Sequence, residues 1–164
     1  MLRARLWYGP AGHGLTLDSV ARYLGGPLAC RLSTDSRSQF GREVARLILH
    51  DPIAAVIEQH RRPEVSAEAA DLVTRLPATA SPALAQKLGA CTARLDIHDA
   101  PGHRLAPATG PARSVFVPLA FAMDGIVEEV QGGRLLLFRL PEESRPAGWV
   151  TRTVSGLLRP VLRR

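Results

Sequence analysis

The sequence predicts an α/β (α+β) protein in which a mixed β-sheet is covered by helices. Short alternations of apolar and polar residues, typical of strands with one buried face, occur at Leu2 to Tyr8 and at Cys91 to His98. Capped, amphipathic segments lie between such runs, and this order of elements favours helices packed on a sheet. A length of 164 residues with 46% hydrophobic side chains suits one core. We therefore expect one domain over 1–164, with possible sub-units 1–58 and 91–140 joined by a helical segment, 64–89.

The first elements follow from local patterns. Leu2 to Tyr8 is expected to be a strand, followed by a glycine-rich loop from Gly9 to Gly14. Thr16 is a suitable cap for a helix through Leu24 that ends at the following glycine pair. Leu28 to Ser33 alternates again and predicts a second short strand.

The segment that follows predicts the clearest helix of the chain. Ser36 to Gln39 fits a capping box, and apolar residues then recur at helical spacing, at Phe40, Val44, Leu47 and Ile48. The pair Asp51-Pro52 should end this helix near His50. Ile53 to Ile57 favours a buried strand, although Asp51 as a cap with Pro52 in the first turn could also begin a helix.

The centre of the chain predicts helices and one more strand. Two short helices are expected within 64–89, the second capped by Ser81 and ended by Gly89. Cys91 to His98 is the next strand, with Asp96 and His98 on the same side of it. The Pro- and Gly-rich stretch Ala100 to Ala112 predicts a long loop.

The last third predicts a short buried helix, a C-terminal β-hairpin and a basic amphipathic helix. Val115 to Asp124 is apolar throughout and favours the buried helix. Gly132-Gly133 lies between two apolar runs, 126–131 and 134–140, which indicates a hairpin turn. Trp149 to Arg164 carries the amphipathic pattern.

Composition limits the class of protein. The net charge is +6, and of the 21 basic residues only Lys87 is a lysine, which a GC-rich coding sequence would also produce. The positive excess lies at the two ends of the chain. Because there is neither an apolar stretch of membrane-spanning length nor a secretory signal, we expect a cytoplasmic protein without a transmembrane segment. Cys30 and Cys91 are expected to be free thiols, and no cofactor is predicted.

Three groups of residues are candidates for a site. Gly12, His13 and Gly14 precede a helix N-terminus and could contact an anion, but they match neither a P-loop nor a dinucleotide fingerprint. Asp96, His98 and His103 form the densest group of potential metal ligands or acid-base residues, so His13, His98 and His103 are the catalytic candidates. The third group is a basic patch for nucleic acid or a partner, namely Arg61, Arg62, Arg152, Arg159 and Arg163.

Two further patterns have simpler interpretations. The hydroxyls of Ser33 to Ser38 could include a nucleophile only with a base such as His50 or His13, and helix capping explains them better. Glu128 and Glu129 are neighbours on a strand, so they should point to opposite faces and be solvated rather than form a carboxylate pair.

The sequence thus favours a noncatalytic protein-interaction or regulatory module with a protein partner or as a homo-oligomer, because apolar helices are plentiful and convergent polar groups are scarce. A nucleic-acid-binding protein that uses its arginine-rich ends is the second hypothesis. The third is a small enzyme that uses His13 or the group Asp96, His98 and His103.

Overall fold

The computed structural model describes residues 1–10, 15–39, 42–105 and 111–137. The described strands are β1 (Leu2–Tyr8), β2 (Arg31–Gln39), β3 (Arg42–Asp51), β4 (Ala55–His60), β5 (Ala93–Asp99), β6 (Ile126–Glu129) and β7 (Arg134–Leu137). The described helices are α1 (Leu17–Gly25), α2 (Pro63–Thr74), α3 (Pro82–Gly89) and α4 (Pro111–Ala122). The chain is therefore an α+β protein, as the sequence predicts.

The strands form one 7-stranded sheet in the order β2-β3-β4-β5-β1-β6-β7. Every pairing is antiparallel, so the expectation of a mixed sheet is wrong. Parallel neighbours need a crossover connection that returns the chain to the same end of the sheet. Here β2, β3 and β4 are consecutive in the chain and adjacent in the sheet, so short connections join them as antiparallel neighbours. The strands of 1–58 and 91–140 also interleave, because β1 lies between β5 and β6.

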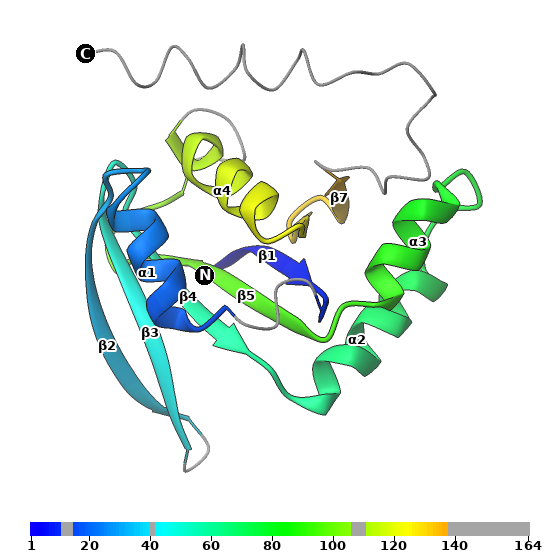
Figure 1. Ribbon diagram of the computed structural model, residues 1–164, viewed down its shortest axis with the longest axis horizontal. Coiled ribbons are helices and arrows are strands. Elements are labelled where there is room, and N and C mark those ends of the chain that lie inside the picture. Colours follow the sequence, from blue (N-terminus) through cyan, green and yellow to red (C-terminus); the bar gives the residue numbers. More distant parts are fainter. Residues whose placement is uncertain (11–14, 40–41, 106–110, 138–164) are drawn as a thin grey trace.

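The helices pack in two pairs on opposite faces of the sheet. Figure 1 shows α1 beside α4, and α2 beside α3 at a distance from them. The main core lies beneath α1 and α4 and takes alternate residues of the central strands, among them Leu6, Tyr8, Leu47, Leu49, Ile57, Leu95 and Ile97. Alternation places the intervening residues of the same strands on the other face.

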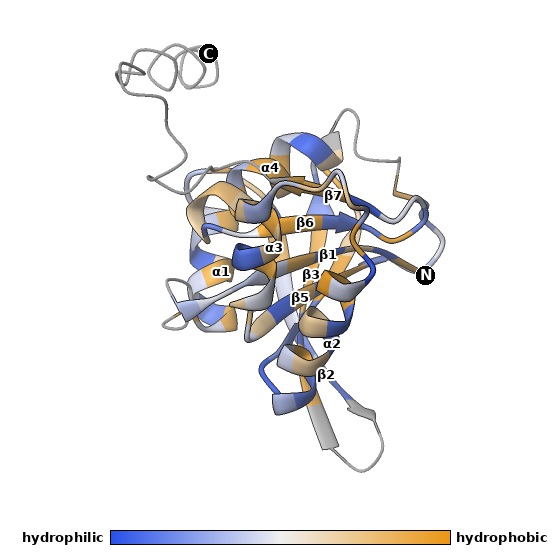
Figure 2. Ribbon diagram, turned by 90° about the vertical axis from the view of Figure 1, so that its right-hand side faces the viewer, coloured by the Kyte–Doolittle hydropathy of each residue, from blue (hydrophilic) through white to orange (hydrophobic). Residues whose placement is uncertain are grey.

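The second face is only partly covered by helices within the described residues. At one end of it, α2 and α3 bury a smaller cluster made of Trp7, Val65, Ala69, Leu88, Cys91 and Ile126. In Figure 2, α2 lies in front of the sheet, and the long β2–β3 hairpin extends past the other strands. Burial of apolar area in both clusters stabilises the sheet from its two sides.

Local capping signals place two helices where the sequence predicts them. The Thr16 side chain accepts a hydrogen bond from the Ser19 amide and begins α1, and the Ser81 side chain accepts from the Leu84 amide and begins α3. The buried helix predicted at Val115 to Asp124 is also confirmed as α4, which begins earlier, at Pro111.

The helix predicted from Ser36 to His50 is wrong. Residues Arg31–Gln39 and Arg42–Asp51 pair with each other as β2 and β3. Leu47 and Leu49 are fully buried beneath α1, whereas Arg46 and Ile48 face the other side, so the segment has the alternating environment of a strand. Pairing along the length of two strands, together with burial of these leucines, outweighs the helical spacing of the apolar residues.

The predicted C-terminal hairpin is present as β6 and β7, with Gly133 at a φ of 60° in the connecting turn. A positive φ favours glycine, which explains the local signal. Residues 138–140 of the hairpin prediction and the amphipathic segment 149–164 lie outside the described residues. Across the described ranges, the helices are all too short or too polar to cross a membrane.

Candidate acid-base site

Charged residues of six strands form a row across the sheet. Each member lies directly opposite the next on the neighbouring strand, and the members are Asp35, Arg46, Glu58, Asp96, Arg5 and Glu128. Opposite charges that face each other across antiparallel strands attract. The pair Glu58 and Asp96 is like-charged and would repel unless cations lie close to both carboxylates. Neighbouring side chains supply those cations.

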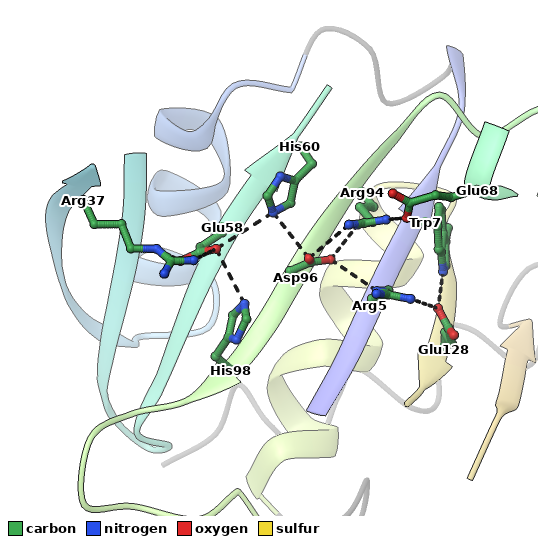
Figure 3. Close-up of polar contacts among 10 residues, drawn as sticks. All are labelled: Arg5, Trp7, Arg37, Glu58, His60, Glu68, Arg94, Asp96, His98 and Glu128. Atoms are coloured by element: carbon green, nitrogen blue, oxygen red, sulfur yellow. Dashed lines mark hydrogen bonds and ion pairs between the residues drawn. The ribbon is translucent and has the colours of Figure 1, made fainter. Parts of the chain in front are cut away.

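Figure 3 shows the side chains that surround this row on the face opposite α1 and α4. We define nine of them as the polar cluster: Arg5, Arg37, Glu58, His60, Glu68, Arg94, Asp96, His98 and Glu128. Three of its four carboxylates are deeply placed, because the side chains of Glu58, Asp96 and Glu128 are 4%, 9% and 10% exposed, whereas that of Glu68 is 46% exposed. A charge that leaves water costs several kcal/mol unless partners compensate it, so the partners of each acid decide whether the cluster is tolerated.

Glu58 is the centre of one half of the polar cluster. Arg37 approaches its carboxylate with two nitrogens, Nε at 2.7 Å from Oε1 and Nη2 at 2.9 Å from Oε2. The Nε2 atoms of His60 and His98 lie 3.9 Å and 3.6 Å from Glu58 Oε2. Two imidazoles thus face one buried carboxylate that a guanidinium holds in place.

Asp96 is the centre of the other half. Arg94 Nε lies 2.8 Å from Asp96 Oδ1, and His60 Nε2 lies 3.3 Å from Asp96 Oδ2. Arg94 also contacts Glu68 of α2, which links this helix to the sheet. His60 therefore lies between the two opposed carboxylates, Glu58 and Asp96, that repel each other.

Burial favours the neutral form of both imidazoles. Burial lowers the pKa of His60 below its ordinary 6.5, although the Asp96 and Glu58 carboxylates act in the opposite direction. Burial also lowers the pKa of His98, against the same two carboxylates. A neutral imidazole carries one donor and one acceptor nitrogen and can therefore receive a proton.

Trp7 supports the opposite side of the polar cluster. Its Nε1 donates a hydrogen bond of 2.8 Å to Glu128 Oε2. The guanidinium carbons of Arg94 and Arg5 lie 5.3 Å and 6.0 Å from the centre of the indole ring, within cation-π range. Glu128 is buried by this arrangement, so the expectation that it is solvated is wrong, whereas Glu129 does point to the other face.

The structure separates the members of the predicted group Asp96, His98 and His103. Asp96 and His98 lie in the polar cluster, but His103 is exposed in the turn that follows β5. In the ranges that the structure describes, no three His, Cys, Asp or Glu side chains are arranged to hold a metal ion. The three residues therefore do not form the metal site that their sequence spacing suggested.

The other predicted residues are dispersed. Gly12, His13, Gly14, Arg152, Arg159 and Arg163 lie outside the described residues. Arg61 and Arg62 are exposed where α2 begins, directly after His60, and they are not members of the polar cluster. Ser33 Oγ lies 2.9 Å from His50 Nε2, but both residues are exposed strand residues, and Ser33 is in β2 rather than at a helix cap.

Sequence reasoning missed the central members of the site, Glu58 and His60. A signal for them exists, because Glu58-Gln59-His60 and Asp96-Ile97-His98 share the spacing acid-x-His, which puts both polar residues on one strand face. Glu58 and Asp96 are direct cross-strand partners in the sheet. The repeated spacing on two strands is therefore the available signal, but the strand expected from the sequence, Ile53 to Ile57, ends before Glu58 and His60.

Searches with this chain against protein-family models, curated proteins and solved structures give no match. The geometry of the polar cluster is therefore the basis for a proposed function.

Proposed function

We propose that the protein is a small enzyme that performs general acid-base chemistry on the polar cluster, with His98 as the catalytic base. The observation that carries this proposal is that the histidines of both acid-x-His pairs face the same carboxylate. The Nε2 atoms of His60 and His98 both lie within 4 Å of Glu58 Oε2. Groups with shifted pKa values that converge in this way occur preferentially at functional sites.

His98 is the better placed of the two imidazoles. Its side chain is 26% exposed, against 14% for His60, so a substrate can reach it. Nε2 of His98 lies 3.6 Å from Glu58 Oε2 and makes no hydrogen bond within the described residues. The negative charge of Glu58 favours the tautomer with its hydrogen on Nε2, which faces the carboxylate, and this tautomer leaves Nδ1 as the proton acceptor. Glu58 is then a positioning residue that selects the tautomer, and Arg37 holds Glu58.

The chemistry requires no group beyond water. His98 Nδ1 takes a proton from water as the oxygen attacks an electrophilic carbon of the substrate, and the leaving group departs with the electron pair of the broken bond. The imidazolium that forms is stabilised by Glu58 and then returns its proton to the leaving group or to solvent.

Hydrolysis of p-nitrophenyl acetate at pH 7.5 tests this proposal, because a general base accelerates attack by water on an activated ester. We expect His98→Gln to lower kcat/KM by about 100-fold or more. The matched control is His50→Gln, since His50 is an exposed strand histidine outside the polar cluster. Loss of activity in His50→Gln but not in His98→Gln would instead assign the reaction to the contact between Ser33 and His50.

Equal rates for the wild type and both variants would overturn the enzyme proposal. The noncatalytic protein-interaction or regulatory module and the nucleic-acid-binding protein would then be the remaining predictions. Neither has a specific observation in its favour among the described residues.

A further inference from the structure

Arg5 differs from the other arginines of the polar cluster in how it is paired. Its Nε lies 3.7 Å from Asp96 Oδ1, and its Nη1 lies 3.6 Å from Glu128 Oε2, both too long for hydrogen bonds. Nε of Arg5 is buried and has no hydrogen-bond partner within the described part of the chain, which is also true of Nε in Arg37 and Arg94, so Arg5 differs from them in its longer ion-pair distances. Arg37 and Arg94, by comparison, approach their carboxylates to 2.7 Å and 2.8 Å.

The two acids beside Arg5 each have a closer partner than Arg5. Arg94 Nε forms an ion pair with Asp96 Oδ1 at 2.8 Å, and Glu128 Oε2 accepts a hydrogen bond of 2.8 Å from Trp7 Nε1. Neither carboxylate therefore depends on Arg5 for a close partner. A guanidinium has five N–H donors, so Arg5 retains donors for another acceptor.

The donors of Arg5 lie on the same face of the sheet as the proposed catalytic base, His98. Arg5 lies opposite Asp96, and His98 is two residues further along the same strand and on the same face. The Arg5 side chain is 26% exposed, as is that of His98. The Trp7 ring restrains the guanidinium from one side, which reduces the entropy lost when a ligand binds.

We infer that Arg5 binds a small oxyanion, a carboxylate or a phosphate, of the molecule on which His98 acts. This inference depends on the proposed function for the role of the oxyanion as part of a substrate, but binding itself does not require turnover. The planar fork of a guanidinium matches the two oxygens of such a group. Asp96 and Glu128 lie close by and repel anions, so a small oxyanion that contacts Arg5 directly fits better than a polyanion such as a nucleic acid.

The binding experiment uses the intrinsic fluorescence of Trp7 in the full-length protein. Trp149→Phe leaves Trp7 as the single tryptophan, since the chain has two. Inorganic phosphate and acetate are titrated separately at constant ionic strength, which distinguishes the two oxyanions. We expect saturable binding of at least one, about tenfold weaker in Arg5→Gln and intermediate in Arg5→Lys, which keeps the charge but loses the fork.

The matched control is Arg134→Gln, because Arg134 also has a loose carboxylate contact, at 3.6 Å from Glu129, but is 70% exposed at the edge of the sheet. Binding should be unchanged in this variant and retained in His98→Gln. The inference would be overturned if the wild type showed no saturable binding. It would also be overturned if Arg5→Gln and Arg5→Lys bound the oxyanion with the same affinity as the wild type. If Arg5→Gln does not fold, as judged by circular dichroism, Arg5→Lys decides the result.

The two proposals fail separately. Ester hydrolysis that depends on His98, without binding of either oxyanion, would leave the enzyme proposal standing and remove Arg5 from ligand binding. Oxyanion binding that depends on Arg5, without any turnover, would leave a ligand-binding site and remove the enzyme proposal.

Discussion

Arg37 contacts Glu58 across an intervening strand. Arg37 is in β2 and Glu58 in β4, and β3 lies between them, where Val44 is the direct partner of Arg37. The guanidinium nevertheless reaches the carboxylate with Nε at 2.7 Å (Figure 3). The long edge hairpin is thereby connected to the centre of the candidate site, because Glu58 is also the carboxylate that both imidazoles face.

The first prediction concerns the energy of this contact. We expect Arg37→Met to lower the free energy of unfolding by about 2 kcal/mol, because it leaves a buried carboxylate without its close cation. Arg37 itself is 38% exposed, which keeps the effect below that of a fully buried pair. Urea unfolding of Arg37→Met, Glu58→Gln and the double variant measures the coupling. Strict additivity of the two single changes would contradict a direct interaction.

The second prediction tests the positioning role of Glu58. The Glu58 carboxylate raises the pKa of His98 against the larger effect of burial, which lowers it. Glu58→Gln should therefore lower the pKa of His98 further, and the acidic limb of the rate profile should move to lower pH with it. Titration of the imidazole resonances by NMR measures the first effect.

Glu129→Gln is the control for this titration, because Glu129 lies next to Glu128 but on the other face of the sheet. It should leave the pKa of His98 unchanged. A purely structural role of Glu58 would reduce activity without moving the pH profile, and that result would remove Glu58 from the mechanism.

The third prediction is a loss of stability in mild acid. Burial holds the pKa values of His60 and His98 below 6.5, so the unfolded chain binds more protons than the folded protein as the pH falls below that value. Their contribution to stability is complete above pH 6.5 and decreases as the pH falls through it. The urea midpoint should therefore be lower at pH 5.5 than at pH 7.5.

Asp99 provides the comparison at lower pH. Its hydrogen bond from Arg3 is the main reason that the pKa of Asp99 lies below its ordinary 3.8, so its contribution is lost only in stronger acid. Asp99→Asn should leave the difference between pH 7.5 and pH 5.5 intact, whereas His98→Gln should reduce it. An unchanged difference in His98→Gln would mean that other groups cause the acid sensitivity.

The fourth prediction concerns the two thiols. Burial raises the pKa of Cys91 to about 12, and burial also raises the pKa of Cys30. Thiolates are the reactive species, so neither cysteine should react with a disulfide reagent in the folded protein at pH 8. Ellman's reagent should count two thiols per chain in urea and almost none without it. Rapid labelling of the folded protein would show that the core around Cys30 or the core around Cys91 opens readily.

The sequence by itself determined the elements whose signals are local. Alternation in Leu2 to Tyr8, the caps Thr16 and Ser81 and the glycine pair at the hairpin each depend on a few adjacent residues, and all of them are found where they were expected. Local patterns failed at Ser36 to His50, because helical spacing and strand alternation are both compatible with those apolar residues. Strand pairing and burial decided between them.

Tertiary structure decided the candidate site to a greater degree than it decided the helices and strands. The sequence placed Asp96 and His98 on one face of a strand, because side chains alternate along a strand. It could not place Glu58 opposite Asp96, or bring Arg37 and Arg5 to either side of them, because register and strand order are set by contacts between distant residues. The chemistry of the face therefore depends on the antiparallel order of the sheet, which no single stretch of the sequence encodes.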